Sequence, residues 1–355
     1  MDNDEAAEAV EGHSRRAFLA SAAGLTGVAL AAGAWRAPAA FGADAAPVAP
    51  AVGSGAAAPG AGGVPGPVLI ALTLDGTAAG ALRSFEGGHP EADVVTEKLG
   101  ADHIIHKHIG GVKYEDISVS CGTGMVKGFY NWVKDSFDSK FSRHDGSVDV
   151  GSIIGGTSTL AFSSALISEI GMPALDAASK DAAKMTIKLS PEITRFSRSG
   201  GKLPINTKIQ KQWTPANFRL EIDGLDATRV NKIDAITIKQ TNVLVSPGGG
   251  TAVVLGPAKL EFPDLQIQLP EANADSWFQW LEEFVVKGNN GQDAERGGKL
   301  AYLATDGTAL FTLGFRNLGI FKLTPDKVEA GSDNLRRSVS ASLYCEQITF
   351  DHFLQ

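Results

Sequence analysis

Cysteine is nearly absent from this chain of 355 residues, which contains only Cys121 and Cys345. Two cysteines cannot form the dense disulfide framework that holds small secreted domains together, so a hydrophobic core has to stabilise this fold. We expect both thiols to be buried and unpaired, because free cysteine behaves as a small apolar side chain. A single disulfide between them stays open as the alternative.

Basic charge is also scarce. The 32 lysines and arginines are outnumbered by 40 aspartates and glutamates, which gives a formal net charge of −8. The basic residues are scattered rather than gathered into a stripe, so nucleic-acid binding through a basic patch is not expected. With 43% hydrophobic and 20% charged residues, the composition is ordinary for a soluble globular protein.

Long apolar runs are missing as well, apart from one short run near the N-terminus. Arg15 and Arg16 precede this Ala/Gly/Leu-rich run, and residues 43–45 follow it with the small-x-small pattern of a signal-peptidase site. This order predicts a twin-arginine signal peptide over residues 1–45, and therefore export to the periplasm or the extracellular space. A chance pair of arginines before an alanine-rich tail is the alternative. The run is too short and too rich in glycine to span a membrane, so no transmembrane segment is expected after cleavage.

The rest of the chain contains an internal repeat. At an offset of 148 residues, Ile70–Leu74 with its Asp-Gly ending recurs as Phe218–Ile222 with the same ending, and Trp132 recurs as Trp280. One register holds as far as Leu175, after which the second copy gains six residues and the offset becomes 154. A register that holds over this length indicates a duplicated domain.

The repeat sets the expected domain boundaries. The two copies predict domains at residues 68–197 and 215–355, each of a common domain size. Residues 198–214, which include a Gly pair and a Pro, are expected to link them. Residues 46–67 contain only Ala, Gly, Pro, Val and Ser, a composition that cannot bury a core and predicts a flexible linker.

The residue pattern of each copy predicts strands, one helix and then more strands. Tyr114–Cys121 and its counterpart Phe262–Leu269 alternate apolar and polar residues, which indicates half-buried strands. Apolar residues at spacings of three and four predict helices over Val126–Phe137 and Trp277–Phe284. Later strands are expected at Leu160–Phe162, Lys184–Leu189, Ala309–Leu313 and Ser338–Tyr344.

These elements define the expected fold class. We expect a mainly β (α+β) protein with two tandem antiparallel β-sandwich or barrel domains, each with one packed helix. Trp132 and Trp280 fall on the inner face of the two helices, where they are expected to be core anchors.

One segment of the first copy has a distinctive order of features: a Lys/Gly lead-in, a short strand, a Gly/Thr-containing turn, and a helix that carries a tryptophan. The residues are Lys107, Gly110, Gly111, Tyr114, Asp116, Ile117, Gly122, Thr123 and Trp132. This segment resembles the tail-tube proteins of contractile-tailed phages and of related contractile injection systems. The second copy keeps Phe262, Asp264, Leu265 and Trp280 but has Pro247–Gly250 in place of the lead-in.

The resemblance implies a β-barrel-like unit that self-associates through sheet edges into rings, which stack into a tube. Two fused copies imply a ring of three chains, a pseudo-hexamer, with other tail or injection-system components as further partners. Gly87–Gly111 corresponds to the family's extended loop, which contacts neighbouring subunits. The fusion of two copies and the export signal both depart from the family's usual subunit.

Catalytic chemistry has little support in the sequence. His103, His106 and His108 form the most metal-like cluster, since imidazoles at this spacing could share a zinc or copper ion. The second copy has no histidine in the corresponding segment, and we favour an exposed loop over a metal site. No nucleophile elbow or phosphate-binding loop is present, so neither a catalytic residue nor a cofactor is predicted.

Three functions therefore remain from different classes. A non-enzymatic structural protein of tail-tube type is favoured. The alternative is an exported binding or adhesion module that presents loops from paired β-domains. A metal-dependent enzyme at the histidine cluster is the weakest of the three.

Overall fold

The computed structural model describes residues 67–354, except for 98–104, 153–154, 200–202, 204–212, 246–253 and 328–336. The expected signal peptide with Arg15 and Arg16 lies outside the described residues, as does His103. In the part of the chain that is described, no helix is both long and apolar enough to cross a membrane.

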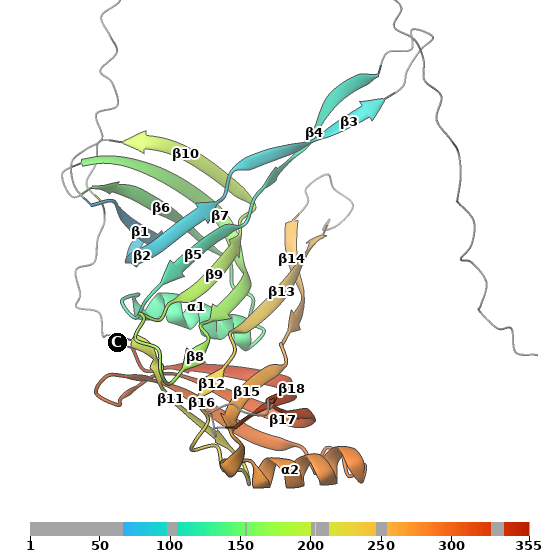
Figure 1. The fold of residues 1–355 in the computed structure, drawn as a ribbon. Coiled ribbons are helices and arrows are strands. Elements are labelled where there is room, and N and C mark those ends of the chain that lie inside the picture. Colours follow the sequence, from blue (N-terminus) through green and yellow to red (C-terminus); the bar gives the residue numbers. More distant parts are fainter. Residues whose placement is uncertain are drawn as a thin grey trace, which may run out of the picture. The chain divides into compact units, whose positions relative to one another are not determined.

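The first half forms a closed barrel of six antiparallel strands (Figure 1). In barrel order the strands are β1 (Leu69–Leu74), β2 (Thr77–Gly87), β5 (Ile117–Cys121), β9 (Met185–Ser190), β7 (Gly155–Met172) and β6 (His144–Ser152). The Asp75-Gly76 turn joins β1 to β2, with φ values of 47° and 75°. Positive φ at both central residues is what a two-residue hairpin turn requires, and this explains the Asp-Gly pair.

The second half arranges its strands in the same order but does not close. Its sheet runs β11 (Trp213–Ile222), β16 (Arg296–Ala304), β17 (Ala309–Pro325), β18 (Ser338–His352), β15 (Leu265–Pro270) and β12 (Lys232–Ile233). Among the described residues β11 and β12 form no ladder, whereas their counterparts β1 and β2 do. The short strand β8 (Leu175–Asp176) from the first half pairs with β12 instead. The molecule is thus mainly β, with two barrel-like domains, as expected.

One helix packs on each barrel. The first is α1 (Lys127–Phe137), and the second is α2 (Asp275–Leu281), which follows a 3-10 turn (Glu271–Asn273) and continues as a π-helical turn (Glu282–Val286). Trp132 is 1% and Trp280 is 3% exposed, each on the inner face of its helix. The Trp132 indole N–H donates to the carbonyl of Ser142 at 3.0 Å.

Two hairpins extend the barrels. Residues expected to form a loop at Gly87–Gly111 instead include the strands β3 (Pro90–Glu97) and β4 (His106–Tyr114), which reach away from the first barrel (Figure 1). Their counterparts in the second half are β13 (Ile236–Val245) and β14 (Val254–Glu261). A further strand, β10 (Ile193–Ser199), pairs with β7.

Both cysteines are free and buried. Cys121 lies in β5, and its burial raises the pKa of the thiol to about 12. Cys345 lies in β18, where burial raises the pKa of the thiol to about 11. Both side chains act as small apolar core groups at neutral pH.

Candidate functional site

The two halves contact each other through helix α1, which packs on the second barrel. Phe137 stacks on Phe350 with ring centroids 5.4 Å apart, and Tyr130 lies 5.3 Å from the ring of Phe311. At the rim, Lys134 forms an ion pair with Asp351. One face of α1 therefore covers β17 and β18 with aromatic contacts and a charged edge.

His352 completes this contact. Its Nε2 atom lies 2.9 Å from the Asn131 amide oxygen, and its ring lies 5.5 Å from that of Tyr130. Burial lowers the pKa of His352 below its usual value, which favours the neutral ring with its N–H donated to Asn131.

The second contact between the halves is a strand addition. β13 pairs with β7 in antiparallel register, from Ile236 opposite Met172 to Lys239 opposite Glu169. The β7 edge is available there because its ladder with β6 ends at Ala165. Ile236 and Ile238 are 2% and 1% exposed. The hairpin of the second copy thus extends the sheet of the first.

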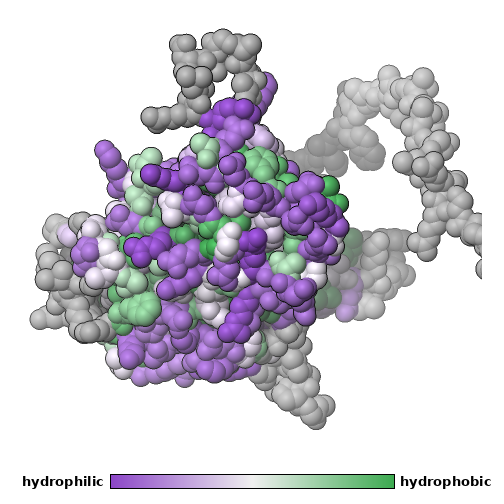
Figure 2. All heavy atoms as spheres, turned by 90° about the horizontal axis from the view of Figure 1, so that it is seen from below, coloured by the Kyte–Doolittle hydropathy of each residue, from purple (hydrophilic) through white to green (hydrophobic). Residues whose placement is uncertain are grey.

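The counterparts of these contact surfaces are uncovered. At the offset of 148 residues, Tyr130 and Phe137 of α1 correspond to Phe278 and Val285 in α2 and its π-helical extension. Phe278 is 36%, Val285 47% and Val286 67% exposed. Figure 2 shows hydrophobic areas among hydrophilic ones on the face seen from below, the side on which α2 lies in Figure 1.

The surface on β18 that receives α1 also has an uncovered counterpart in the first half. At the offset of 154, Phe350 in β18 corresponds to Phe196 in β10. Phe196 is 59% exposed and Ile193 is 45% exposed. The guanidinium of Arg198 lies over the Phe196 ring, 6.0 Å from its centroid.

The hairpin β3–β4 is the third uncovered counterpart. Val94 is 57%, Val95 45%, Ile109 72% and Val112 61% exposed. Within the described residues β3 and β4 pair only with each other. The equivalent hairpin β13–β14, by contrast, is attached to the other barrel through β13.

The fourth uncovered counterpart is one edge of β17. The ladder of β17 with β16 ends at Leu318, so in the described part of the sheet Gly319–Pro325 pairs only with β18. Phe321 in this stretch is 45% exposed. At the offset of 148 residues, the β7 positions that receive β13 correspond to Asn317–Ile320, so the free stretch of β17 overlaps them at Gly319 and Ile320.

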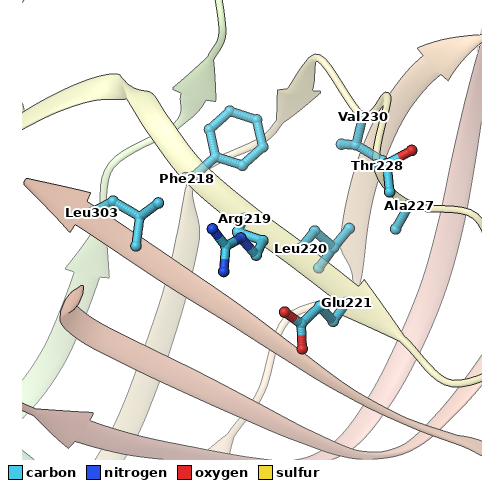
Figure 3. Close-up of a pocket in the computed structure, with 8 residues that line it drawn as sticks. All are labelled: Phe218, Arg219, Leu220, Glu221, Ala227, Thr228, Val230 and Leu303. Atoms are coloured by element: carbon cyan, nitrogen blue, oxygen red, sulfur yellow. The ribbon is translucent and has the colours of Figure 1, made fainter. Parts of the chain in front are cut away.

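A cavity of about 350 Å³ marks the opening in the second barrel (Figure 3). It separates β11 from the segment that would have paired with it, and its lining residues are Phe218, Arg219, Leu220, Glu221, Ala227, Thr228, Val230 and Leu303. The segment is held away from β11 by hydrogen bonds to α2. The Trp277 indole donates to the Asp226 carbonyl at 3.0 Å, and the Asp226 N–H donates to Ser276.

The histidine cluster is only partly described. His106 and His108 lie on β4 and are exposed, and the Nε2 atom of His108 is 4.0 Å from a Glu97 carboxylate oxygen. His103 falls outside the described residues. Within the described ranges, no group of three or more His, Cys, Asp or Glu side chains could hold a metal ion.

Sequence reasoning did not find the exposed faces of α2 and β10 or the free edge of β17, whereas the family resemblance implied a loop that contacts neighbours where the hairpin β3–β4 lies. The faces of α2 and β10 could have been found by placing the apolar residues of one copy at the positions of the other. From the sequence alone, Phe278 and Val285 fit an ordinary amphipathic helix. Only the contact of α1 with the second barrel indicates that this face of the helix can contact a barrel.

The fold defines a protein of two tandem, antiparallel, barrel-like β domains, each carrying one helix. The sequence matches no protein-family model. It also matches no curated protein.

Solved structures similar to part of this chain come from contractile injection systems. A chain of the anti-feeding prophage baseplate aligns at 10% identity and a TM-score of 0.29, over 38% of this chain and 91% of its own length. A chain of the sheath-tube complex of an extracellular contractile injection system (PVC) aligns at 17% identity and a TM-score of 0.31, over 37% of this chain and 88% of its own. A chain of the cap of the anti-feeding prophage aligns at 14% identity and a TM-score of 0.29, over 44% and 95%.

Proposed function

We propose that this chain is a non-enzymatic structural protein of tail-tube type, which self-associates head to tail into rings or tubes. The proposal joins the family resemblance of Lys107–Trp132 to the contact between the two halves. In this assembly each junction between chains repeats the junction within the chain. Three chains then form a pseudo-hexameric ring.

The observation that carries the proposal is that only one of the two equivalent hairpins is paired with a barrel of the other half. β13–β14 adds to the edge of β7, whereas β3–β4 exposes Val94, Val95, Ile109 and Val112. An exposed strand edge with apolar side chains is a template for pairing with another chain. The free edge of β17 from Gly319 to Pro325, which overlaps the counterpart of the β7 acceptor at Gly319 and Ile320, is the acceptor, and the added strand gains main-chain hydrogen bonds as in other cases of β-augmentation.

The symmetry of the contact supports head-to-tail growth. The donor hairpin and the acceptor edge lie in different halves of the chain, so the interface is heterologous. A heterologous contact generates a ring when its rotation closes and a filament when it does not. The fold thus allows both a ring and a tube from one repeated contact.

The magnitudes indicate that the hairpin needs a second contact. Complete burial of the four hairpin side chains contributes at most roughly 6–12 kcal/mol, from about 1.5–3 kcal/mol each. Association costs about 4–15 kcal/mol before any net affinity appears. The hairpin alone therefore gives weak association, and a stable assembly uses a further surface as well.

Particle formation by the mature chain, residues 46–355, tests the proposal. We expect concentration-dependent self-association by light scattering and rings by negative-stain microscopy. Val94→Asp should reduce the assembled fraction, whereas Val68→Asp, at a residue 71% exposed outside the hairpin, should leave it unchanged. A wild-type protein that stays monomeric at all concentrations and salts would refute the proposal.

We also propose that the protein is exported by the twin-arginine route and assembles with itself and with other injection-system components outside the cytoplasm. The order of Arg15, Arg16, the apolar run and the cleavage pattern supports this location. Arg15→Lys with Arg16→Lys should leave the precursor in the cytoplasmic fraction. Release of a processed protein from this variant in normal amount would contradict it.

The second candidate is an exported binding or adhesion module. The exposed hairpin β3–β4 favours it, because its apolar side chains and the histidines of β4 could contact a foreign surface. A monomeric protein whose binding to cell-wall glycans is lost in Val94→Asp would favour this function over assembly.

A further inference from the structure

Helix α2 and strand β10 are uncovered at positions equivalent to a contact already made inside the chain. We propose that the face formed by Phe278, Glu282, Val285 and Val286 docks on β10 of a second copy of this chain. The contact residues on β10 are Phe196 and Arg198, which lie on the same face of the strand. This inference rests on the proposed self-association and names its second surface.

The contact of α1 with β18 provides the template. Phe137 stacks on Phe350, and Tyr130 packs against His352. With the offset of 148 residues for the helix and 154 for the strand, the pair Phe137 and Phe350 becomes Val285 and Phe196. The second pair becomes Phe278 with Arg198. An aliphatic side chain against a phenyl ring keeps the apolar contact, and a phenyl ring beside a guanidinium gives a cation–π pair.

The exposed apolar side chains on both surfaces favour docking. Val286 is 67% and Phe196 59% exposed, while the buried face of the helix, with Trp277 and Trp280, already packs on its own barrel. The exposed residues are therefore a second apolar face of the same helix. Clustered apolar exposure of this kind marks an interaction site.

The charges of the two surfaces are complementary. The rim of the template is Lys134 on the helix with Asp351 on the strand. In the proposed contact the helix carries exposed Glu282 in place of Lys134, and the strand has Ser197 in place of Asp351 with exposed Arg198 beside it. The charge of the helix is thus reversed, and the strand is basic where the template strand is acidic.

This reversal gives specificity. α2 against β18 would place Glu282 near Asp351, and like charges in a contact disfavour it. α2 against β10 places Glu282 near Arg198. Helix α1 therefore pairs with β18 within the chain, and α2 pairs with β10 between chains. As a result, first and second copies alternate around the assembly.

The direction of this contact agrees with that of the hairpins. Within the chain, the first copy provides the helix and the second provides the hairpin β13–β14. Between chains, the second copy provides α2 and the first copy of the neighbour provides β3–β4. Both new contacts therefore form at one junction, as the two template contacts do.

Cysteine pairing across the junction provides a direct test. Val285→Cys and Phe196→Cys are prepared as separate full mature chains, mixed, and treated with a mild oxidant. We expect a disulfide-linked dimer in the mixture and little in either variant alone. A yield equal to that of Val285→Cys mixed with Phe353→Cys, at a phenylalanine that is also 59% exposed, would overturn the docking.

Charge reversal provides an independent readout. Glu282→Arg should weaken self-association about ten- to a hundredfold, and combining it with Arg198→Glu should restore it. Phe196→Asp should weaken it similarly, whereas Phe353→Asp should not. Circular dichroism checks that every variant keeps the wild-type melting temperature.

The outcomes separate this inference from the proposed function. If wild-type protein assembles and all of these variants assemble equally well, the α2–β10 docking is wrong while self-association through β3–β4 stands. If wild-type protein never self-associates, both are wrong. Restoration of assembly in the charge-swapped combination supports both.

Discussion

Phe350 and Phe196 stand at equivalent positions of the two copies, but replacement by alanine should destabilise the fold strongly at Phe350 and hardly at all at Phe196. Phe350 is 1% exposed and stacks with Phe137 and Phe311, at 5.4 and 5.7 Å between ring centroids. Loss of such a buried ring costs about 3–5 kcal/mol of unfolding free energy. Phe196 is 59% exposed, and its loss should change the unfolding free energy by no more than about 0.5 kcal/mol.

Urea unfolding at a protein concentration below that of assembly measures this difference. Tryptophan fluorescence and circular dichroism are followed together for wild type, Phe350→Ala and Phe196→Ala. In thermal melts, Phe350→Ala should lower the transition by about 6–20 °C, from roughly 2–4 °C for each kcal/mol. Equal losses in the two variants, or a loss below about 1 kcal/mol in Phe350→Ala, would refute the assignment of one surface as covered and the other as free.

The same pair separates folding from assembly. At high concentration Phe196→Ala should sediment as smaller species than wild type, although its monomer is equally stable. This effect arises only if β10 contacts a second chain. Unchanged sedimentation with unchanged stability would leave Phe196 without a role in assembly.

Three further predictions concern single residues. Because burial raises the pKa of the Cys121 thiol to about 12, a thiol reagent at pH 8 should label it only after denaturant is added; rapid labelling of native protein would contradict its burial. Burial lowers the pKa of His352 from 6.5, so the folded chain binds a proton less readily than the unfolded chain, and the stabilisation present above about pH 6.5 is lost as the pH falls. His352→Gln should therefore show a smaller loss of unfolding free energy between pH 7.5 and 5.5 than wild type, and an equal loss would exclude His352 as a cause. Gly76→Ala should cost about 1–2 kcal/mol in urea unfolding, since φ is 75° while an added Cβ meets no atom within 4 Å; a neutral effect would show that the turn relaxes.

Local patterns in the sequence predicted much of each barrel. Alternation predicted one strand over Tyr114–Cys121, of which the structure places Ile117–Cys121 in β5 and Tyr114 at the end of β4. Apolar spacing predicted the helix that the structure places at Lys127–Phe137. The Asp-Gly pair at residues 75 and 76 is typical of a two-residue hairpin turn, and both residues have the positive φ that such a turn requires. These elements follow local rules because each has one buried face.

The hairpin β3–β4 could not be predicted in this way. Its apolar residues are exposed on a hairpin that stands apart from the barrel, so they leave no period-two pattern against a core. The opening of the second barrel could not be predicted from the sequence for another reason. Asp223-Gly224 repeats the Asp-Gly pair of the first copy, but only Gly224 has a positive φ. After this pair Asp226 bonds to Trp277 and Ser276 of α2, a long-range contact that no local pattern reveals.

The opening between β11 and β12 has a consequence for how the molecule comes apart. The closed barrel holds every strand between two neighbours, so no strand can leave without breaking two ladders. In the second barrel β11 forms a ladder only with β16 among the described strands, and it can be peeled from its free side. Amide protons of β11 should therefore exchange with solvent before those of β1, and thermal or mechanical unravelling should begin at this seam.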